Sequence, residues 1–456
     1  MASDLPLVRL GDYVDACLGK MLDAQKNRGK LQPYLGNSNV RWGAFDLEDL
    51  AVMRFEEHED ERYGIRDGDL IVCEGGEPGR CAIWRGDTPM KIQKALHRVR
   101  TKNGLDNHFL YYWFLQAGRT GELEPFFTGT TIKHLTGRAL AELRIPLLPI
   151  ESQREVAKVL RSLDAKIDLN HRINQTLEAM AQAIFQSWFV DFDPVKAKIA
   201  AKAEGRDPLR AAMSAISGKA DAELDALPPE QYEQLAATAA LFPDEMEESE
   251  LGEIPKCWRC ETFGTIAELS KGSVNPLLSP ERVFEHYSLP AFDAGKQPVV
   301  EEGVQIKSNK TKFARGAVLQ SKLNPHIPRV WFPLRVSENA VCSTEFLPWI
   351  AKEPASPSFV YCLLTSDLFG LQVRSLVTGT SNSHQRVKPD QVSGLLTVVP
   401  SDGLLSAFTG TVTPFFERIE SGTNQIRDLA GLRDVLLPKL LSGELQVQHT
   451  EPEAVA

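Results

Sequence analysis

The sequence predicts an α+β protein in which two mixed α/β domains are joined by two long helices. These helices are expected to pair as an antiparallel intramolecular coiled coil, which gives the molecule pseudo-two-fold symmetry. Three observations predict this fold. The chain has 456 residues, more than one ordinary hydrophobic core contains. A heptad pattern runs through residues 151–192 and returns 252 residues later. Before each long helix, short apolar runs alternate with turn residues.

The first long helix is predicted from a heptad seam. Alternating steps of four and three reach ten positions, eight apolar and two Asn: Val156, Leu160, Leu163, Ile167, Asn170, Asn174, Leu177, Ala181, Ile184 and Trp188. Adding 252 gives a second set, again with eight apolar members: Phe408, Val412, Phe415, Ile419, Gly422, Ile426, Leu429, Arg433, Leu436 and Leu440. A seam that occurs twice in one chain predicts that the two helices pair with each other. The two Asn either fill a solvated gap between the helices or fix their register.

Residues 1–150 form the first predicted domain. Asp69–Cys73 reads as a strand, Glu74–Arg80 as a loop and Cys81–Trp84 as a returning strand. His108–Gln116 lacks a period of two and is predicted to be a buried helix. Phe126–Pro149 closes the domain with a Gly/Thr loop, a short helix and a strand.

The remaining chain repeats this organisation. Residues 151–192 are the first spacer helix and 193–250 a helical, acidic connector, followed by a second domain at 251–400. The second spacer helix covers 401–445, and 446–456 is a polar tail. Gly316 lies 248 residues after the equivalent Gly68, and a TGT tripeptide recurs after 250 residues, which predicts a duplicated scaffold with two divergent domains. Pro414 predicts a kink or a late start of the second helix.

Composition places the chain among globular proteins, with 43% hydrophobic and 25% charged residues. No run of 18 apolar residues and no signal-peptide pattern is present, so neither a membrane span nor export is expected. Seven scattered Cys favour reduced thiols and a cytoplasmic location. The net charge of −10 does not exclude nucleic acid, because residues 88–105 and 303–337 contain basic side chains and no acidic one.

Catalytic signatures are missing from the sequence. It contains no phosphate-binding G-x-x-x-x-G-K-[ST] loop, no H-E-x-x-H and no G-x-S-x-G. The pair Cys257 and Cys260 has C-x-x-C spacing, but no second pair completes a zinc site, so a structural role is favoured. We therefore expect no metal and no cofactor bound by this chain.

Two Gly/Thr loops, Thr128–His134 and Thr378–Arg386, place small residues beside hydrogen-bond donors that can read base edges. Composition alone favours a simpler interpretation, tight turns with solvated charges. The candidates for base contacts are Thr130, Lys133, His134, Asn382, His384, Gln385 and Arg386. The basic candidates for DNA binding are Lys91, Lys94, Lys307, Lys310, Lys312 and Arg329, the last four as phosphate contacts.

Three blocks, Arg144–Val195, Leu251–Arg259 and Leu432–Leu445, resemble the specificity subunits of type I restriction–modification systems, and the resemblance covers nearly the whole chain. It implies two target-recognition domains, each reading one half of a split double-stranded DNA target, with the helix pair as spacer. It also implies a chain without catalytic activity. Two methyltransferase subunits would bind it and use S-adenosylmethionine, and two motor-nuclease subunits that use ATP and Mg²⁺ can join.

Two alternatives compete with this interpretation. A coiled-coil protein adaptor without sequence-specific DNA binding would need only the helix pair. A stand-alone nuclease or methyltransferase is the weakest hypothesis, because no acid cluster and no cofactor loop supports it. The DNA target and the length of its gap cannot be derived, since base readout depends on loop geometry.

Overall fold

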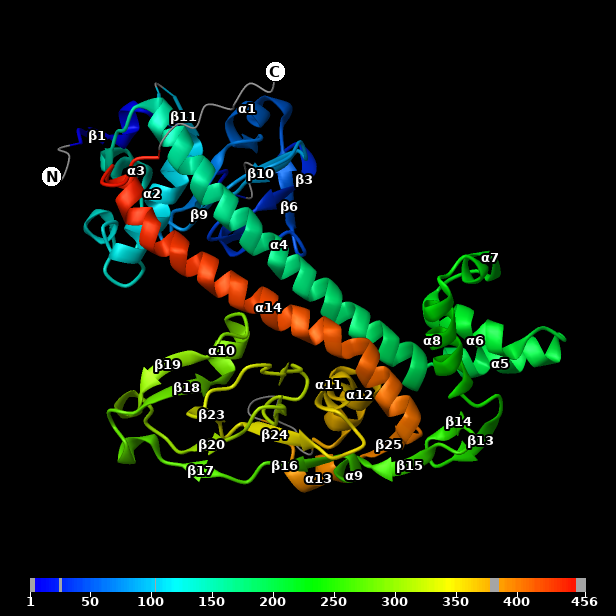
Figure 1. The fold of residues 1–456 in the computed structure, drawn as a ribbon. Helices are drawn as coiled ribbons and strands as arrows, with labels where there is room; N and C mark the ends of the chain where they lie inside the picture. Colours follow the sequence, from blue (N-terminus) through cyan, green and yellow to red (C-terminus); the bar gives the residue numbers. More distant parts are fainter. Residues whose placement is uncertain (1–4, 24–26, 103, 378–384, 448–456) are drawn as a thin grey trace, which may run out of the picture. The chain divides into compact units, whose positions relative to one another are not determined.

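The structure, a computed structural model, describes residues 5–23, 27–102, 104–377 and 385–447. The chain divides into two compact units: unit 1 takes Met1–Leu169 and Gln425–Ala456, and unit 2 takes Asn170–Asn424. Each unit holds one mixed α/β domain and one half of each long helix (Figure 1). The predicted α+β fold class is confirmed. Because the units divide both helices, the domain boundaries given above stay a prediction.

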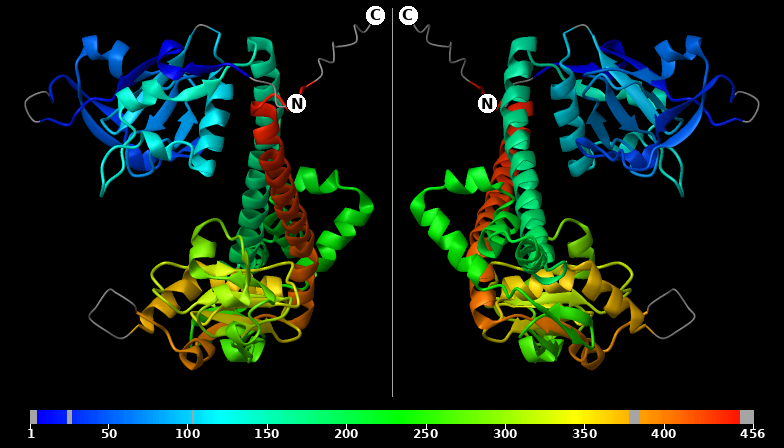
Figure 2. Two further views of the ribbon diagram at one scale, coloured as in Figure 1. Left: turned by 90° about the vertical axis from the view of Figure 1, so that its left-hand side faces the viewer. Right: turned by 90° about the vertical axis from the view of Figure 1, so that its right-hand side faces the viewer.

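The two long helices are α4 (Ile150–Phe189) and α14 (Asp402–Leu441), each of 40 residues. In unit 1, Asp164 of α4 pairs with Arg433 of α14. In unit 2, Asn174 of α4 pairs with Thr423 of α14. In unit 2, Phe185, Trp188 and Phe189 follow Asn174 on α4 and contact Phe408, which precedes Thr423 on α14, so the helix halves run antiparallel (Figures 1 and 2). The halves in unit 1 also run antiparallel, because Val156 and Leu160, before Asp164, share a core with Leu437, Leu440 and Leu441, after Arg433.

The domain of unit 1 contains two four-stranded sheets. The first has the order β2 (Val14–Leu18), β11 (Leu96–Thr101), β8 (Leu70–Cys73) and β9 (Cys81–Ile83). The second has the order β6 (Ala51–Phe55), β3 (Lys30–Leu35), β10 (Met90–Ile92) and β7 (Gly64–Ile65). Two strand pairs complete the domain. They are β1 (Leu7–Arg9) with β12 (Arg144–Pro146), and β4 (Val40–Arg41) with β5 (Ala44–Phe45). The strands predicted on either side of the Glu74–Arg80 loop are therefore confirmed as β8 and β9.

The predicted buried helix of the first domain is α2 (Asn107–Thr120), and it is confirmed. It begins where the Asp106 carboxylate accepts the backbone N–H groups of His108 and Phe109, and it ends at Gly121 with φ +77°. Its aromatic residues join one core with Val156 and Leu160 of α4 and with Leu437, Leu440 and Leu441 of α14. The remaining helices are short: α1 (Asp60–Tyr63) and α3 (Gly137–Glu142).

The domain of unit 2 repeats the strand order of unit 1. Its four-stranded sheet has the order β16 (Ala267–Leu269), β24 (Phe346–Ala351), β21 (Ala317–Ser321) and β22 (Val330–Trp331). Its five-stranded sheet has the order β17 (Ser273–Val274), β20 (Lys310–Lys312), β23 (Ala340–Ser343), β18 (Val283–Tyr287) and β19 (Val299–Glu302). In both units a parallel pair, β3 with β10 or β18 with β23, lies inside the second sheet. The duplicated scaffold predicted from the sequence is confirmed.

Helices and a strand pair complete this domain. They are β15 (Arg259–Thr262) with β25 (Leu396–Val399), and α9 (Phe263–Ile266), α10 (Leu289–Asp293), α11 (Pro357–Thr365), α12 (Asp367–Ser375) and α13 (Pro389–Ser393). Phe408 of α14 lies 5.2–6.1 Å, between ring centroids, from Phe185, Trp188 and Phe189 of α4. This aromatic core fixes the half of the helix pair that belongs to unit 2.

The stretch between α4 and the second domain is a helical excursion, drawn in green in Figures 1 and 2. It consists of α5 (Asp193–Ala203), α6 (Pro208–Ser217), α7 (Asp221–Asp225) and α8 (Pro229–Ala240), and a small core joins α6, α7 and α8. The acidic residues that follow form a hairpin of β13 (Met246–Ser249) and β14 (Gly252–Pro255).

Pro414 does not delay the second long helix. The predicted late start is wrong, because α14 begins at Asp402 and continues through Pro414. Pro414 and Gly410, whose carbonyl group loses its hydrogen-bond donor, both lie on the exposed side of the helix. Water can therefore satisfy the freed carbonyl, which explains why the proline is tolerated.

Among the described residues, no helix is long and apolar enough to cross a membrane. All seven cysteines lie within the described ranges, and none of them forms a disulfide.

Candidate nucleic-acid interface

The predicted base-reading loop of unit 1 lies beside the loop between β8 and β9. The Leu135 N–H group donates to the Glu74 carbonyl oxygen at 2.7 Å. A Cβ atom on Gly75 would lie 3.0 Å from Nδ1 of His134, so glycine allows the close approach of the two loops. We call the two loops, Glu74–Arg80 and Thr128–His134, the loop edge of unit 1. Three predicted residues, Thr130, Lys133 and His134, lie together there.

Exposure differs along the Thr128–His134 loop. Thr130 and Lys133 are exposed, whereas His134 is half-buried. The Lys133 ammonium lies 4.0 Å from the Glu124 carboxylate and 5.9 Å from the Phe127 ring centroid. Both contacts are weak for an exposed side chain, so Lys133 can exchange them for a phosphate or a base.

A polar cluster on the same edge was missed by the sequence analysis. Trp42 Nε1 donates to the Glu77 carboxylate at 2.6 Å, and Arg80 donates to the same carboxylate at 2.9 Å. Arg80 also donates to the Asn37 carbonyl oxygen at 3.0 Å. Within the described part of the chain, Arg80 Nε and Asn37 Oδ1 are buried without a hydrogen-bond partner. The one signal in the sequence was the charged, glycine-rich loop Glu74–Arg80 itself.

Unit 2 carries an equivalent loop edge, formed by Lys322–Arg329 and the chain from Gln385 to Val387. The Val387 N–H group donates to the Lys322 carbonyl oxygen at 3.0 Å, as Leu135 does to Glu74 in unit 1. The Asn324 N–H group donates to the Gln385 carbonyl oxygen at 2.8 Å. The same backbone contact thus joins two loops in each unit, although the side chains around it differ.

The predicted base contacts of unit 2 are only partly described. Gln385 is half-buried on the loop edge. Arg386 forms a two-pronged ion pair with Glu345, at 3.0 and 3.2 Å, which raises the pKa of Arg386. Asn382 and His384 lie outside the described residues.

The predicted basic contacts fall into two groups. Lys94, Lys307 and Lys312 are exposed. Lys94 lies in the turn that ends at Ala95, whose carbonyl oxygen accepts the Glu74 N–H group at 2.8 Å, so it adjoins the loop edge of unit 1. Lys312 lies on β20, in the five-stranded sheet of unit 2, and Lys307 lies in the segment just before this strand.

The second group of basic residues is engaged inside the protein. Lys91 is 5% exposed and its ammonium lies 2.5 Å from Asp60. Lys310 is 6% exposed and donates to Ser308 Oγ at 2.7 Å, and burial lowers its pKa. Arg329, near the loop edge of unit 2, pairs with Asp293 at 2.7 and 2.9 Å. These contacts favour structural roles, and the DNA contacts predicted for these three residues stay untested.

The predicted seam residues are buried or half-buried on the two long helices. Leu160, Leu163, Ile167 and Ile426 are buried in unit 1, where Leu429 and Leu436 are half-buried. In unit 2, Leu177, Ile184 and Ile419 are half-buried. Ile184 and Ile419 pack against the aromatic core around Phe408.

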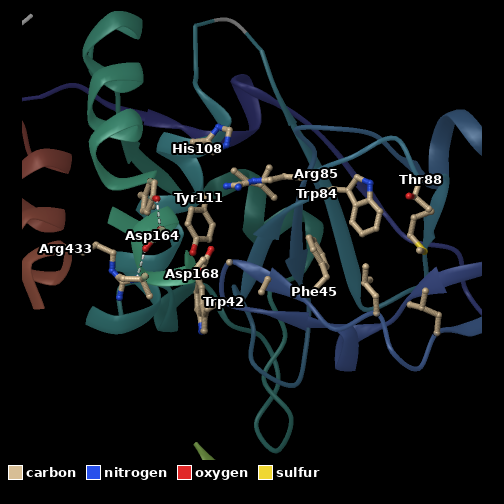
Figure 3. Close-up of a pocket in the computed structure, with 18 residues that line it drawn as sticks. Trp42, Phe45, Trp84, Arg85, Thr88, His108, Tyr111, Asp164, Asp168 and Arg433 are labelled. Carbon is tan, nitrogen blue, oxygen red and sulfur yellow. Dashed lines mark hydrogen bonds and ion pairs between the residues drawn. The ribbon is translucent and has the colours of Figure 1, made fainter. Parts of the chain in front are cut away.

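A cavity of about 500 Å³ lies in unit 1, where the domain meets α4 and α14 (Figure 3). Its lining includes the aromatic side chains Trp42, Phe45, Trp84 and Tyr111. Asp164 accepts hydrogen bonds from Tyr112 Oη at 2.6 Å and from Arg433 at 2.8 Å. Burial lowers the pKa of His108 to about 4, so this lining residue is neutral at pH 7. The Tyr112–Asp164–Arg433 chain of contacts ties the domain to both helices of its unit.

Comparison with known proteins gives consistent matches. The family described as "Type I restriction modification DNA specificity domain" matches residues 3–179. The HindI specificity subunit of Haemophilus influenzae is 30% identical over 69% of this chain and 72% of its own length. The MjaIX specificity subunit of Methanocaldococcus jannaschii is 26% identical over 84% of this chain and 78% of its own. A crystal structure of a type I restriction–modification S subunit from M. genitalium has a TM-score of 0.51 at 14% identity, covers 98% of both chains, and is alike in fold.

Proposed function

Because the chain belongs to the specificity subunits of type I restriction–modification systems, we propose that its two units each read one half of a bipartite double-stranded DNA target. In this proposal the base contacts come from the loop edges, and exposed lysines such as Lys94 and Lys312 contact phosphates.

The observation that carries this proposal is the loop edge that occurs in both units. The hydrogen bond from Leu135 to Glu74 recurs as that from Val387 to Lys322, so one backbone frame is used twice. The side chains of the two loop edges differ: unit 1 has Lys133 and His134, and unit 2 has Gln385 and Arg386. One frame with two sets of side chains suits a target whose halves differ in sequence.

The α4–α14 pair would set the gap between the half-sites and dock methyltransferase subunits. A helix of 40 residues is about 60 Å long, and DNA repeats about every 34 Å. A helix pair of fixed length would therefore separate the two DNA-reading domains by a distance that corresponds to a fixed number of base pairs.

The chain itself would carry no catalytic step. Two methyltransferase subunits would supply S-adenosylmethionine and methylate adenine, and two motor-nuclease subunits that use ATP and Mg²⁺ can join them. Its own residues would bind, orient and space the DNA.

Exchange of recognition segments tests the proposal. Replacing residues 10–145 by those of a relative should change one half of the methylated sequence, and replacing 260–395 the other half. Mapping of methylated bases in cells that express the hybrid and its methyltransferase partner measures this. A swap that changed both halves would contradict the two-reader proposal.

The adaptor hypothesis predicts a different result. A gel-shift titration of the complex with its methyltransferase partner should show binding to DNA that weakens steeply with salt. An adaptor without a DNA-reading function would leave the affinity and sequence preference of the methyltransferase unchanged.

A further inference from the structure

Each loop edge carries one exposed isoleucine. Ile132 belongs to the Thr128–His134 loop of unit 1, and 63% of its surface is exposed. Ile327 belongs to the Lys322–Arg329 loop of unit 2, and 43% of its surface is exposed. Neither side chain belongs to a hydrophobic cluster of the described residues. Burial against a partner would remove this apolar surface from water.

Ile132 lies in a tight loop of unit 1. Thr128 and His134 exchange two backbone hydrogen bonds of 2.8 Å, which close the loop at its base. Gly129 has φ +96°, and a Cβ atom there would overlap the carbonyl oxygen of Ile132. The β-branched side chain also has few rotamers to lose on binding. Ile132 is therefore an apolar side chain with few rotamers on a loop whose backbone is closed by hydrogen bonds.

In unit 2, the backbone of Ile327 is held in a hydrogen-bonded turn. Its N–H group donates to the Asn324 carbonyl oxygen at 2.8 Å, which closes a turn. Asn324 itself donates to the Gln385 carbonyl oxygen at 2.8 Å. The turn that carries Ile327 is therefore bonded through Asn324 to the backbone of Gln385, a predicted base contact of the same unit.

An apolar side chain can read only one feature of a base edge in the major groove, the C5 methyl group of thymine. We propose that Ile132 and Ile327 each contact a thymine methyl group in the half-site read by their own unit, and so select thymine there. This inference rests on the proposed function and deepens it, because it names a base and the side chain that reads it.

The experiment uses duplexes in which thymine is replaced by uracil, which removes only the methyl group. The target is first mapped from methylated bases in cells that express the chain with its methyltransferase partner. Duplexes with that target, each with one thymine replaced by deoxyuridine, are then titrated with the complex at fixed salt. For the unaltered protein, one such replacement in each half-site should weaken binding about fourfold, the effect of one buried methyl group.

The variants assign the two contacts. Ile132→Ala should abolish the uracil effect in one half-site only, and Ile327→Ala in the other only. Ile132→Val, which keeps most of the apolar surface, should retain it. Leu31→Ala is the matched control, because Leu31 on β3 is 60% exposed but lies outside both loops, and it should change nothing.

Three results would overturn the inference. The first is a uracil series without effect in either half-site. The second is an Ile132→Ala protein that still loses fourfold with the same duplex. The third is a rise in 2-aminopurine fluorescence on binding that Ile132→Ala removes, since that indicates a wedge that unstacks bases. A complex that does not distinguish the mapped duplex from a scrambled one would instead contradict the proposed function itself.

Discussion

Asn174 of α4 lies directly over Gly422 of α14 in unit 2. Its Nδ2 atom donates to Thr423 Oγ1 at 3.2 Å, and a Cβ atom on Gly422 would overlap its Oδ1 atom. Of the two interpretations of the seam asparagines, a solvated gap or a fixed register, this contact favours fixed register for Asn174. A one-turn slip would place a larger side chain against the asparagine, whereas the observed register places a glycine there.

The first prediction concerns the fit of Gly422. Gly422→Ala should be about 1–3 kcal/mol less stable to unfolding than Gly431→Ala, because the new methyl group displaces Asn174 and breaks its hydrogen bond. Both variants gain the same helix propensity. Gly431 is a matched control, since among the described atoms nothing lies within 4 Å of its Cβ position. Urea unfolding of the full chain measures the difference, and equal stabilities would contradict the tight fit.

The second prediction separates a DNA contact from a structural lysine. Lys94→Ala should lower the slope of log affinity against log salt by about one, because one phosphate contact is lost. Lys91→Ala should leave that slope unchanged and destabilise unit 1, because Asp60 loses the buried partner of its carboxylate. Salt titrations of DNA binding and urea unfolding are the two measurements. A change of salt slope in Lys91→Ala would contradict the structural role.

The third prediction concerns pH. Burial lowers the pKa of His97, whose Nε2 atom lies 3.0 Å from the Leu135 carbonyl oxygen. The unfolded chain takes up a proton near pH 6.5 and the folded chain only at lower pH. The stability that His97 contributes is therefore complete above about pH 6.5 and is lost as pH falls, by at most about 1.4 kcal/mol per pH unit. His108 and His286, whose pKa values burial also lowers, act in the same direction.

Urea unfolding at pH 7.5, 6.5 and 5.5 measures this dependence. His97→Gln should flatten the fall in stability below pH 6.5, whatever its effect at neutral pH. An unaltered slope in His97→Gln would show that His97 is not responsible.

The fourth prediction concerns the spacer. Seven residues are inserted into both long helices at the same level, between Thr176 and Leu177 and between Glu420 and Ser421. A heptad adds about 10 Å of helix, which should widen the gap by about three base pairs without changing either half-site. Methylated-base mapping reads the gap. An insertion in one helix alone should instead destabilise the pair, and an unchanged gap in the double insertion would refute the spacer role.

Much of the fold follows from signals between residues that are close in sequence. The heptad spacing predicted both long helices to within a few residues, α4 at Ile150–Phe189 and α14 at Asp402–Leu441. Alternating apolar runs and turn residues predicted β8, β9 and the loop between them. Internal echoes after about 250 residues predicted the duplicated scaffold. Periodicity and turn chemistry act within a few residues, so they can be read from the sequence.

The tertiary structure decided which predicted side chains remain available. Lys91 and Lys94 look alike in the sequence, but Asp60, 31 residues away, engages the first and leaves the second exposed. The cluster of Trp42, Glu77 and Arg80 likewise joins two loops that are separate in the sequence, the turn between β4 and β5 and the Glu74–Arg80 loop. Burial and ion pairing depend on residues that only folding brings together, so a local sequence pattern cannot predict them.

The family and the two-domain scaffold were thus determined by the sequence alone. The tertiary structure decided the loop edges, the partners of the basic residues and the position of Asn174 over Gly422. The physical reason is distance along the chain, since Asn174 meets Thr423 across 249 residues.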